Sequence, residues 1–406
     1  MNPSEELVLE LCQRSFLSLW SVANPQGKES GKELCDVLVV CDPDIVIFSV
    51  KEIALGADDP GETELRRWHR RAVDTSAKQL YGAERILGQL ERIQHPDGSH
   101  AIHLPPKDRR RTHRVVVALG GGGKVPIVFG DLGKGFVNVF DETSLHLILN
   151  ELDTVTDFVE YLTAKEDQYL RSDSQMVLTG GEENLLALYL HRGRTIPDEA
   201  DLVIVQDGLW NELTAKPEWK TRKEEDAVSY FWDRLIEDLT WEFVPDLVPD
   251  PFGLLRDPRG EGEHVVRTMA RENRFARRML SDSFLEFLGL AIQGTHRSRI
   301  VQSPSGIVYV LLARPGTDDR KQRVAELMVR CFIARGITES ATTVVGIATE
   351  IPEPASGSSF DVCWLHKPDW SEEDAQELAR LQQDTGAFTD PVYSRVHVDE
   401  FPTPGQ

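Results

Sequence analysis

Residues 31–52, GKELCDVLVVCDPDIVIFSVKE, constrain the fold more than any other part of the sequence. Two short apolar runs rich in Val and Ile flank an Asp-Pro-Asp turn, and this pattern predicts a β-hairpin. Asp36 stands at the start of the first run and Lys51 at the end of the second, so antiparallel pairing brings both to one edge of a sheet. An acid and an amine at a shared edge are suited to hold a divalent metal ion and a water. Strand ends also carry charges simply because they emerge into solvent, and this stretch alone leaves both interpretations open.

The residues around the hairpin predict an α/β unit over residues 1–170, with a mixed sheet flanked by helices. Apolar residues three and four positions apart predict a helix over 4–20, with Ser4 as its N-cap, and a long helix over 62–94. The other expected elements are strands at 114–119, 125–129 and 136–140 and helices at 144–151 and 156–169.

The remainder of the sequence predicts two further regions. Residues 171–298 are expected to be mainly helical, with one strand at 200–206 and a proline-rich linker at 245–262. Residues 299–406 show the order ββαββα, which is typical of a small α+β sandwich. The last residues, 399–406, are expected to fray.

The formal net charge is −22, so the chain as a whole is not expected to bind nucleic acid non-specifically. Residues 61–114 reverse that sign, with twelve Lys and Arg against seven Asp and Glu. If DNA is the substrate, it is expected to lie along this segment. The alternative is a solvated helix face, which charge runs usually are. The candidate DNA-binding residues are Arg66, Arg67, Arg70, Arg71, Arg109, Arg110 and Arg111.

The sequence shows no feature of membrane insertion or secretion. No apolar run approaches the roughly 18 residues that a membrane-spanning helix needs. The N-terminal MNPSEELVLELCQ has acids where a secretory signal has a basic start. The five cysteines are odd in number and form no CxxC pair, which favours buried thiols in a reducing compartment. We therefore expect a cytoplasmic protein that does not enter a membrane.

The order of elements around the hairpin resembles the PD-(D/E)XK nuclease superfamily, which has the restriction-endonuclease-like fold. The resemblance covers roughly the first 100 to 140 residues. The residues that carry it are Glu10 on the first helix, Asp36 at the start of a strand, Ser49, Val50 and Lys51 at the end of the next strand, and Gln79 on the following helix.

The resemblance implies a metal-dependent phosphodiester hydrolase. It implies that Asp36 and the carbonyl of Val50 hold Mg²⁺ or Mn²⁺, with Glu10 supporting the site, and that Lys51 acts on the attacking water. Gln79 is similar to the helix residues that some members place over the site. The alternative for Gln79 is a polar position beside a core aromatic residue.

The sequence departs from the family pattern at position 49, where Ser49 replaces an acid. A hydroxyl is a neutral and weaker ligand for Mg²⁺ than a carboxylate. Glu52 is expected to point to the opposite face of the strand, because side chains alternate, and Glu33 is also expected to miss the site. The site therefore either uses Glu10 and Asp36 with Ser49 as an outer partner, or it is inactive.

Two further patterns favour structural explanations. The run Gly120–Gly123 before Lys124 lacks the outer residues of a phosphate-binding loop, so it predicts a turn between strands. The helix expected at 263–290 carries many arginines, for which ion pairing within the chain is favoured over DNA binding. They are Arg267, Arg271, Arg274, Arg277 and Arg278.

The leading functional hypothesis is a Mg²⁺- or Mn²⁺-dependent DNA endonuclease, which the resemblance places in restriction or anti-phage defence by analogy. The alternative is a nuclease fold without activity that binds nucleic acid or protein only. The middle or C-terminal region is expected to bind a protein partner or a second copy of the chain.

Overall fold

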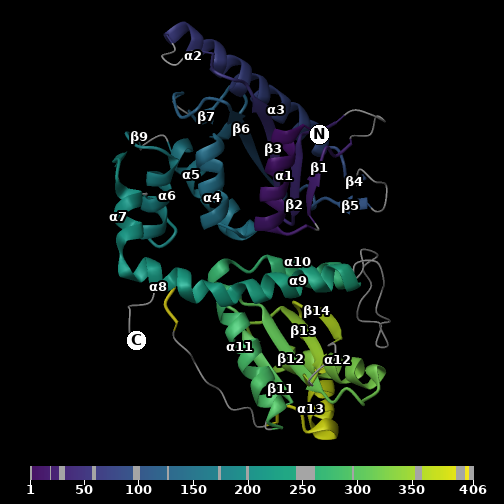
Figure 1. Ribbon diagram of the computed structural model, residues 1–406. Helices are drawn as coiled ribbons and strands as arrows, with labels where there is room; N and C mark the ends of the chain where they lie inside the picture. Colours follow the sequence, from purple (N-terminus) through teal and green to yellow (C-terminus); the bar gives the residue numbers. More distant parts are fainter. Residues whose placement is uncertain are drawn as a thin grey trace. The chain divides into compact units, whose positions relative to one another are not determined.

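The structure is a computed structural model of the 406-residue chain. It describes residues 2–18, 20–26, 33–56, 61–94, 101–125, 128–171, 175–197, 201–243, 261–294, 297–352, 359–389 and 398–401. The fold is mixed α/β, and the chain divides into two compact units, Met1–Lys220 and Thr221–Gln406 (Figure 1). The boundaries predicted after residues 170 and 298 fall inside these units. No helix in the described part of the chain is long and apolar enough to cross a membrane.

The described residues of unit 1 form a mixed sheet of six strands in the order β1-β2-β3-β6-β8-β7. The predicted hairpin is confirmed, because β2 and β3 pair antiparallel with Val37 opposite Phe48 and Cys41 opposite Asp44. β3, β6 and β8 run parallel to one another. The strands are β1 (Ser21–Ala23), β2 (Val37–Cys41), β3 (Asp44–Glu52), β6 (Arg111–Leu119), β7 (Gly130–Asp131) and β8 (Phe136–Phe140).

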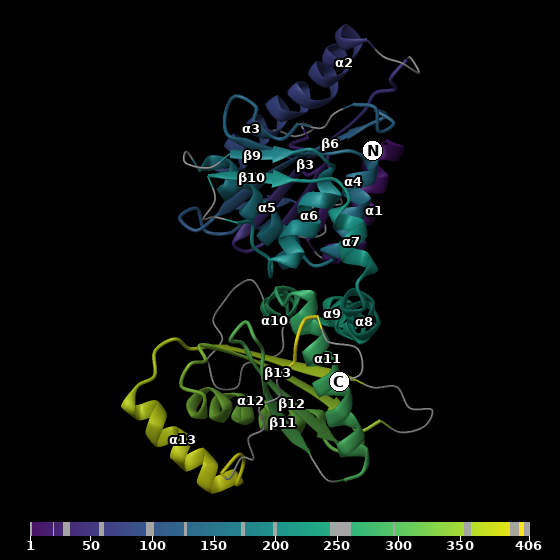
Figure 2. The ribbon, with the colours of Figure 1, turned by 90° about the vertical axis from the view of Figure 1, so that its left-hand side faces the viewer.

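Helices cover both faces of this sheet (Figures 1 and 2). On one face Leu80 packs with Leu38 and Ile47. On the other face the rings of Phe48 and Phe158 stack with centroids 6.3 Å apart, since neighbouring strand residues point to opposite faces. The first face carries α2 (Glu62–His69), the π-helix η1 (Arg70–Asp74) and α3 (Thr75–Leu87), and the second carries α1 (Pro3–Phe16), α4 (Glu142–Glu151) and α5 (Val155–Leu170).

Several predicted bounds in unit 1 differ from the structure. The helix expected over 62–94 ends at Leu87, because β4 (Arg92–Gln94) leaves the helix and pairs with β5 (Ala101–His103). Residues 126–127 of the strand expected at 125–129 lie outside the described residues, and β7 pairs with β8 instead.

The rest of unit 1 contains a strand pair that the sequence pattern only half predicted. β9 pairs parallel with β10, and α6 connects them. The strand expected at 200–206 is β10, whereas β9 was missed because four residues show too little periodicity. The bounds are β9 (Gln175–Leu178), α6 (Glu182–His191), β10 (Leu202–Val205) and α7 (Leu209–Ala215), followed by α8 (Pro217–Asp226).

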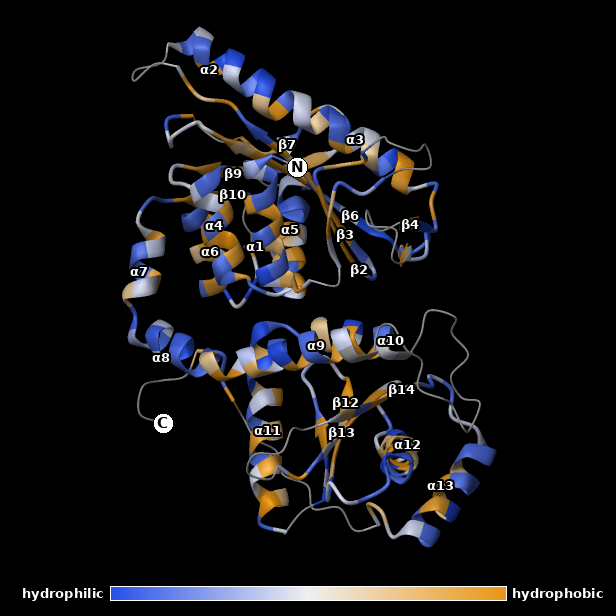
Figure 3. Ribbon diagram, turned by 45° about the vertical axis from the view of Figure 1, so that its right-hand side comes forward, coloured by the Kyte–Doolittle hydropathy of each residue, from blue (hydrophilic) through white to orange (hydrophobic). Residues whose placement is uncertain are grey.

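Unit 2 contains the predicted order ββαββα after a group of helices. Its described strands form one mixed sheet in the order β11-β12-β13-β14, with α12 on one face and α10 and α11 on the other (Figure 2). Figure 3 shows hydrophobic residues on the central strands. Nearly all of the linker predicted at 245–262 lies outside the described residues. The elements are η2 (Ala227–Ser229), α9 (Tyr230–Phe243), α10 (Glu261–Ala270), α11 (Arg274–Ile292), β11 (Ser298–Gln302), β12 (Val308–Arg314), α12 (Arg320–Ile337), β13 (Thr343–Glu350), β14 (Phe360–His366) and α13 (Glu372–Thr385).

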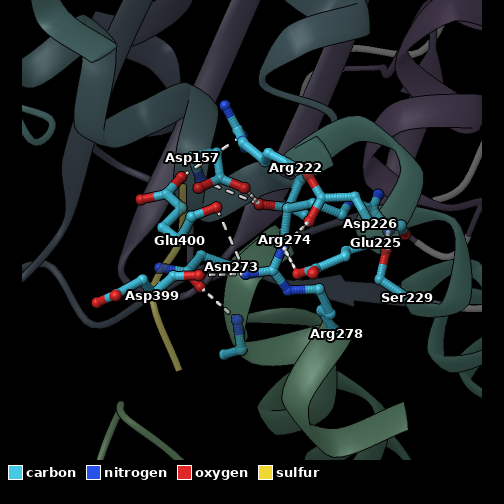
Figure 4. Close-up of polar contacts among 12 residues, drawn as sticks. Asp157, Arg222, Glu225, Asp226, Ser229, Asn273, Arg274, Arg278, Asp399 and Glu400 are labelled. Carbon is cyan, nitrogen blue, oxygen red and sulfur yellow. Dashed lines mark hydrogen bonds and ion pairs between the residues drawn. The ribbon is translucent and has the colours of Figure 1, made fainter. Parts of the chain in front are cut away.

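The single helix expected at 263–290 is divided into α10 and α11, and Arg267 pairs with Glu263 within α10 at 2.7 Å. Arg274, Arg277 and Arg278 on α11 also form ion pairs within the chain, which confirms the favoured interpretation for these residues. Arg274 and Arg277 both pair with Asp233, at 2.8 and 2.6 Å. Arg278 pairs with Asp226 at 3.2 Å (Figure 4). All three arginines are buried. Acids on α8 and α9 therefore neutralise these three arginines, which are not available to DNA.

The C-terminal residues 399–401 are held in place, so the expected fraying is wrong for them. Arg278 donates a hydrogen bond of 2.8 Å to the carbonyl of Asp399. Arg222 pairs with Glu400 at 3.5 Å (Figure 4). The Arg222 guanidinium also lies over the ring of Phe401, 4.8 Å from its centroid. Residues 402–406 lie outside the described residues.

Candidate functional site

The hairpin places Asp36 at the end of the β2–β3 ladder. Its amide donates a hydrogen bond of 3.2 Å to the carbonyl of Phe48. The Val50 amide in turn donates a hydrogen bond of 2.5 Å to the Asp36 carboxylate. Because Val37 is opposite Phe48, Asp36 comes opposite Ser49. The carboxylate is therefore fixed by the backbone of the same strand end that carries Lys51.

Ser49 connects Asp36 to α3. The Ser49 hydroxyl lies 3.1 Å from Oε1 of Gln79 and also hydrogen-bonds the Asp36 carboxylate. A hydroxyl has one proton, so Ser49 donates to one of these groups at a time. Ser49 is buried and Gln79 is exposed. The hydroxyl at position 49 thus links the strand acid to the helix amide.

An open cavity of about 420 Å³ lies at this strand end. It brings together four of the predicted site residues, which are Asp36, Val50, Lys51 and Gln79. The first turn of α1 forms the opposite wall. The lining residues are Asn2, Pro3, Ser4, Glu5, Asp36, Val50, Lys51, Glu52, Ala54 and Gln79.

Glu10 does not line the cavity, and Glu5 does. Five residues along an α-helix correspond to about 7.5 Å and about 140° of rotation, so Glu10 lies further along α1 and faces elsewhere. The helix also starts earlier than expected, because Asn2 and not Ser4 is its N-cap. The Asn2 amide donates a hydrogen bond of 3.0 Å to the Glu5 carboxylate. This capping box, Asn2 followed three residues later by Glu5, is a sequence signal for the start of the helix and places Glu5 in its first turn.

Glu52 was expected to point to the opposite face of the strand and so to miss the site. Its carboxylate accepts a hydrogen bond from the Ser4 hydroxyl. The side chain thus points toward α1, away from Gln79 and α3, as strand alternation requires. It still lines the cavity, because the cavity opens past the end of β3 and extends to the first turn of α1.

Burial raises the pKa of Asp36, and the negative charges of Glu5 and Glu33 raise it further. The hydrogen bonds from the Val50 amide and Ser49 oppose this rise. The cavity is lined by three carboxylates, which belong to Glu5, Asp36 and Glu52, and by one ammonium group, that of Lys51. This charge distribution favours a bound cation.

The carbonyl of Val50 also faces Asp36. The N–H and C=O groups of one strand residue point to the same side, and the Val50 N–H points to the Asp36 carboxylate. Val50 is opposite the residue before Asp36, where β2 has not yet begun. The backbone thus directs one oxygen toward the place where the resemblance implies a metal ligand.

The donor set suits Mg²⁺ or Mn²⁺ in atom type. In the described part of the chain, no group of three or more His, Cys, Asp or Glu side chains is placed to hold a metal ion. Mg²⁺ needs fewer, since it is usually bound through one or two carboxylates with waters and substrate phosphates. Asp36 and Glu5 supply two carboxylates, and the Val50 carbonyl supplies a third hard oxygen.

The seven candidate DNA-binding arginines fall into two groups. Arg109 pairs with Asp42 at 2.6 Å, and Arg111 pairs with the buried Asp44 at 2.8 Å. Arg110 donates a hydrogen bond of 2.6 Å to the carbonyl at the C-terminal end of α3. These three guanidinium groups are thus used in the fold. The four on α2 and η1 are exposed: Arg66, Arg67, Arg70 and Arg71.

Comparisons with known proteins add no relative: no family model, no curated protein and no solved structure matches the chain.

Proposed function

We propose that the protein is a metal-dependent DNA endonuclease that hydrolyses phosphodiester bonds at the cavity beside Asp36. The observation that carries the proposal is the convergence of Asp36, Lys51 and Gln79 with Glu5 around one open cavity at a strand end. Phosphodiester hydrolysis needs a cation and an oriented water, and this group supplies carboxylates for the first and an amine for the second. The role in restriction or anti-phage defence stays a prediction.

Each residue has a distinct part in this proposal. A bound Mg²⁺ or Mn²⁺ supplies positive charge that acidifies a water and neutralises the phosphate. Asp36, Glu5 and the Val50 carbonyl would hold it. Lys51 orients the attacking water and attracts the scissile phosphate to the cavity. Ser49 and Gln79 act as positioning residues that fix the Asp36 carboxylate.

The first test compares two glutamates of the same helix. Plasmid and single-stranded DNA are incubated with Mg²⁺ or Mn²⁺ and with wild type, Glu5→Gln or the matched control Glu10→Gln. We expect Glu5→Gln to lose at least tenfold in cleavage rate, because removing a ligand costs more than about 1.4 kcal/mol of transition-state stabilisation. Glu10→Gln should cut like wild type. Asp36→Asn and Lys51→Met complete the set, and equal traces from wild type and these two would refute the proposal.

A second function, DNA binding without cleavage, is favoured by how the acids are already engaged. Glu5 accepts from Asn2 and Glu52 accepts from Ser4, while Asp36 accepts from the Val50 amide. Burial also favours the neutral form of Asp36. If the second function is correct, wild type binds DNA with no cut product in Mg²⁺ or Mn²⁺, and Asp36→Asn binds DNA equally well.

A further inference from the structure

One row of exposed side chains follows the helical segment from α2 to α3. Arg67, Arg71, Thr75 and Gln79 are four positions apart, and all four are exposed. Arg70 is exposed next to them. The backbone stays helical through η1, so the row is carried by one continuous element.

The π-helix η1 keeps this row aligned. In an α-helix a step of four residues rotates by about 400°, so a row of this spacing drifts by about 40° per step. A π turn holds more residues, because its hydrogen bonds join residues five apart. Since η1 covers Arg70–Asp74, the step from Arg71 to Thr75 rotates by a smaller angle than it would in an α-helix. Arg67 and Gln79 therefore stay closer to one line along the helix.

The row begins at the cavity and runs beside β3 and the residues that follow it. Gln79 lines the cavity at one end. At the other end the Trp68 indole donates a hydrogen bond of 2.6 Å to the carbonyl of Ile53, which directly precedes the cavity residue Ala54. This contact holds α2 beside the strand end, and α2 continues past the sheet as a mostly hydrophilic helix (Figures 1 and 3).

The arginines of the row have no partner within the described part of the chain. No described acidic residue forms an ion pair with Arg67, Arg70 or Arg71, whereas Arg66 pairs with Glu62 at 2.6 Å. Asp74, the acid nearest in sequence to Arg70 and Arg71, faces His69 at 3.3 Å. In a chain of net charge −22, three exposed cations that pair with no acid in the described ranges are suited to an external polyanion.

We propose that Arg67, Arg70 and Arg71 bind the phosphate backbone of the DNA on one side of the bond held at the cavity. This inference rests on the proposed function for its substrate. The twelve positions from Arg67 to Gln79 span about 18 Å at 1.5 Å per residue, which equals about five steps of 3.4 Å along one DNA strand. A substrate should therefore extend at least about five base pairs beyond the scissile bond on that side.

The test measures DNA binding without chemistry. A labelled duplex of about 30 base pairs is titrated in EDTA at several salt concentrations. The double variant Arg67→Gln/Arg71→Gln is compared with the control Arg85→Gln/Arg92→Gln. The control removes the same charge from exposed positions that follow Gln79 in the sequence. The row pair should lower the slope of log K against log salt by about 1.8, at about 0.9 per phosphate contact. The control pair should leave the slope unchanged.

Binding and cleavage fail independently in this design. Loss of binding confined to the row pair supports the inference whether or not wild type cuts DNA. Equal loss in both pairs, or none in either, overturns it even if wild type cuts DNA in Mg²⁺.

Discussion

Position 49 determines how the candidate site holds its acid. Ser49 is buried and contacts both Asp36 and Gln79. A carboxylate there would lie beside Asp36, whose pKa burial already raises. The neutral hydroxyl avoids that repulsion and leaves Asp36 and Glu5 as the acids that would hold the proposed cation.

We expect Ser49→Asp to make stability depend on a divalent cation. In EDTA the added buried charge should lower the free energy of unfolding by about 1–3 kcal/mol. Mg²⁺ should recover part of that loss, because a ligand that binds only the folded state stabilises it. Urea unfolding with and without Mg²⁺ measures this. Ser49→Ala is the control, and an equal response of both variants to Mg²⁺ would contradict the account.

The raised pKa of Asp36 predicts a pH dependence with a definite sign. Where the folded carboxyl binds its proton more tightly than the unfolded one, stability falls as pH rises. The window begins near the ordinary value of 3.8 and extends up to the raised pKa. Asp36→Asn has no titrating carboxyl at this position and does not lose this part of the free energy of unfolding. Its free energy of unfolding relative to wild type should therefore increase as pH rises through that window. Unfolding curves between about pH 3 and 7 test this, and a constant difference would refute it.

At the scale of elements, the parallel pairing of β3 with β6 explains why the arginines at the start of β6 are structural. Asp44 lies opposite Arg111 at the start of this ladder. Burial raises the pKa of Asp44, but the hydrogen bond to His113 and the charge of Arg111 lower it by more. Asp44 is thus charged and paired within the sheet.

Arg111→Gln should lower stability without affecting DNA binding. Removing one partner leaves Asp44 buried with less compensation, which should cost about 1–3 kcal/mol. The Arg111 side chain is 51% exposed, so solvent screening places the effect at the lower end of that range. Chemical denaturation and DNA titration of the same sample separate the two effects. A weaker DNA affinity in the folded variant would show that Arg111 contacts DNA.

The elements near the site could be predicted only in part. The two apolar runs on either side of the Asp-Pro-Asp turn were enough to predict the β2–β3 hairpin and, through it, the meeting of Asp36 and Lys51 at the cavity. Glu10 was predicted to support the site, whereas the structure brings Glu5 to the cavity, because the turn of α1 that meets the strand end is set by tertiary packing. The cavity at Glu52 depends on how α1 packs against the end of β3, which no local pattern encodes.

At the scale of the whole molecule, the chain divides into two units with separate sheets. The predicted ββαββα order of the C-terminal region is present in unit 2. Binary patterning predicts such local order well, but the buried ion pairs of α11 join residues far apart in sequence. The contacts of Arg222 and Arg278 with residues 399–401 also join residues far apart in sequence. A local pattern therefore could not predict them.

Removing the C-terminal residues should destabilise unit 2 selectively. Truncation after Val398 deprives the buried Arg222 and Arg278 of acceptors at Asp399 and Glu400. We expect the thermal transition of unit 2 to fall by about 2–8 °C, with that of unit 1 unchanged. Truncation after Phe401 is the control. Calorimetry measures both transitions, and equal shifts in the two truncated chains would contradict the role of residues 399–401.

The central claim is that a divalent cation binds where β3 ends, between Asp36 and the first turn of α1. The most direct measurement is an anomalous difference map from crystals soaked in Mn²⁺. We predict a peak within coordination distance of Asp36, Glu5 and the Val50 carbonyl, at about 2.0–2.4 Å, that disappears in Glu5→Gln and persists in Glu10→Gln. An ordered cavity without such a peak, or a peak only elsewhere, would contradict the account.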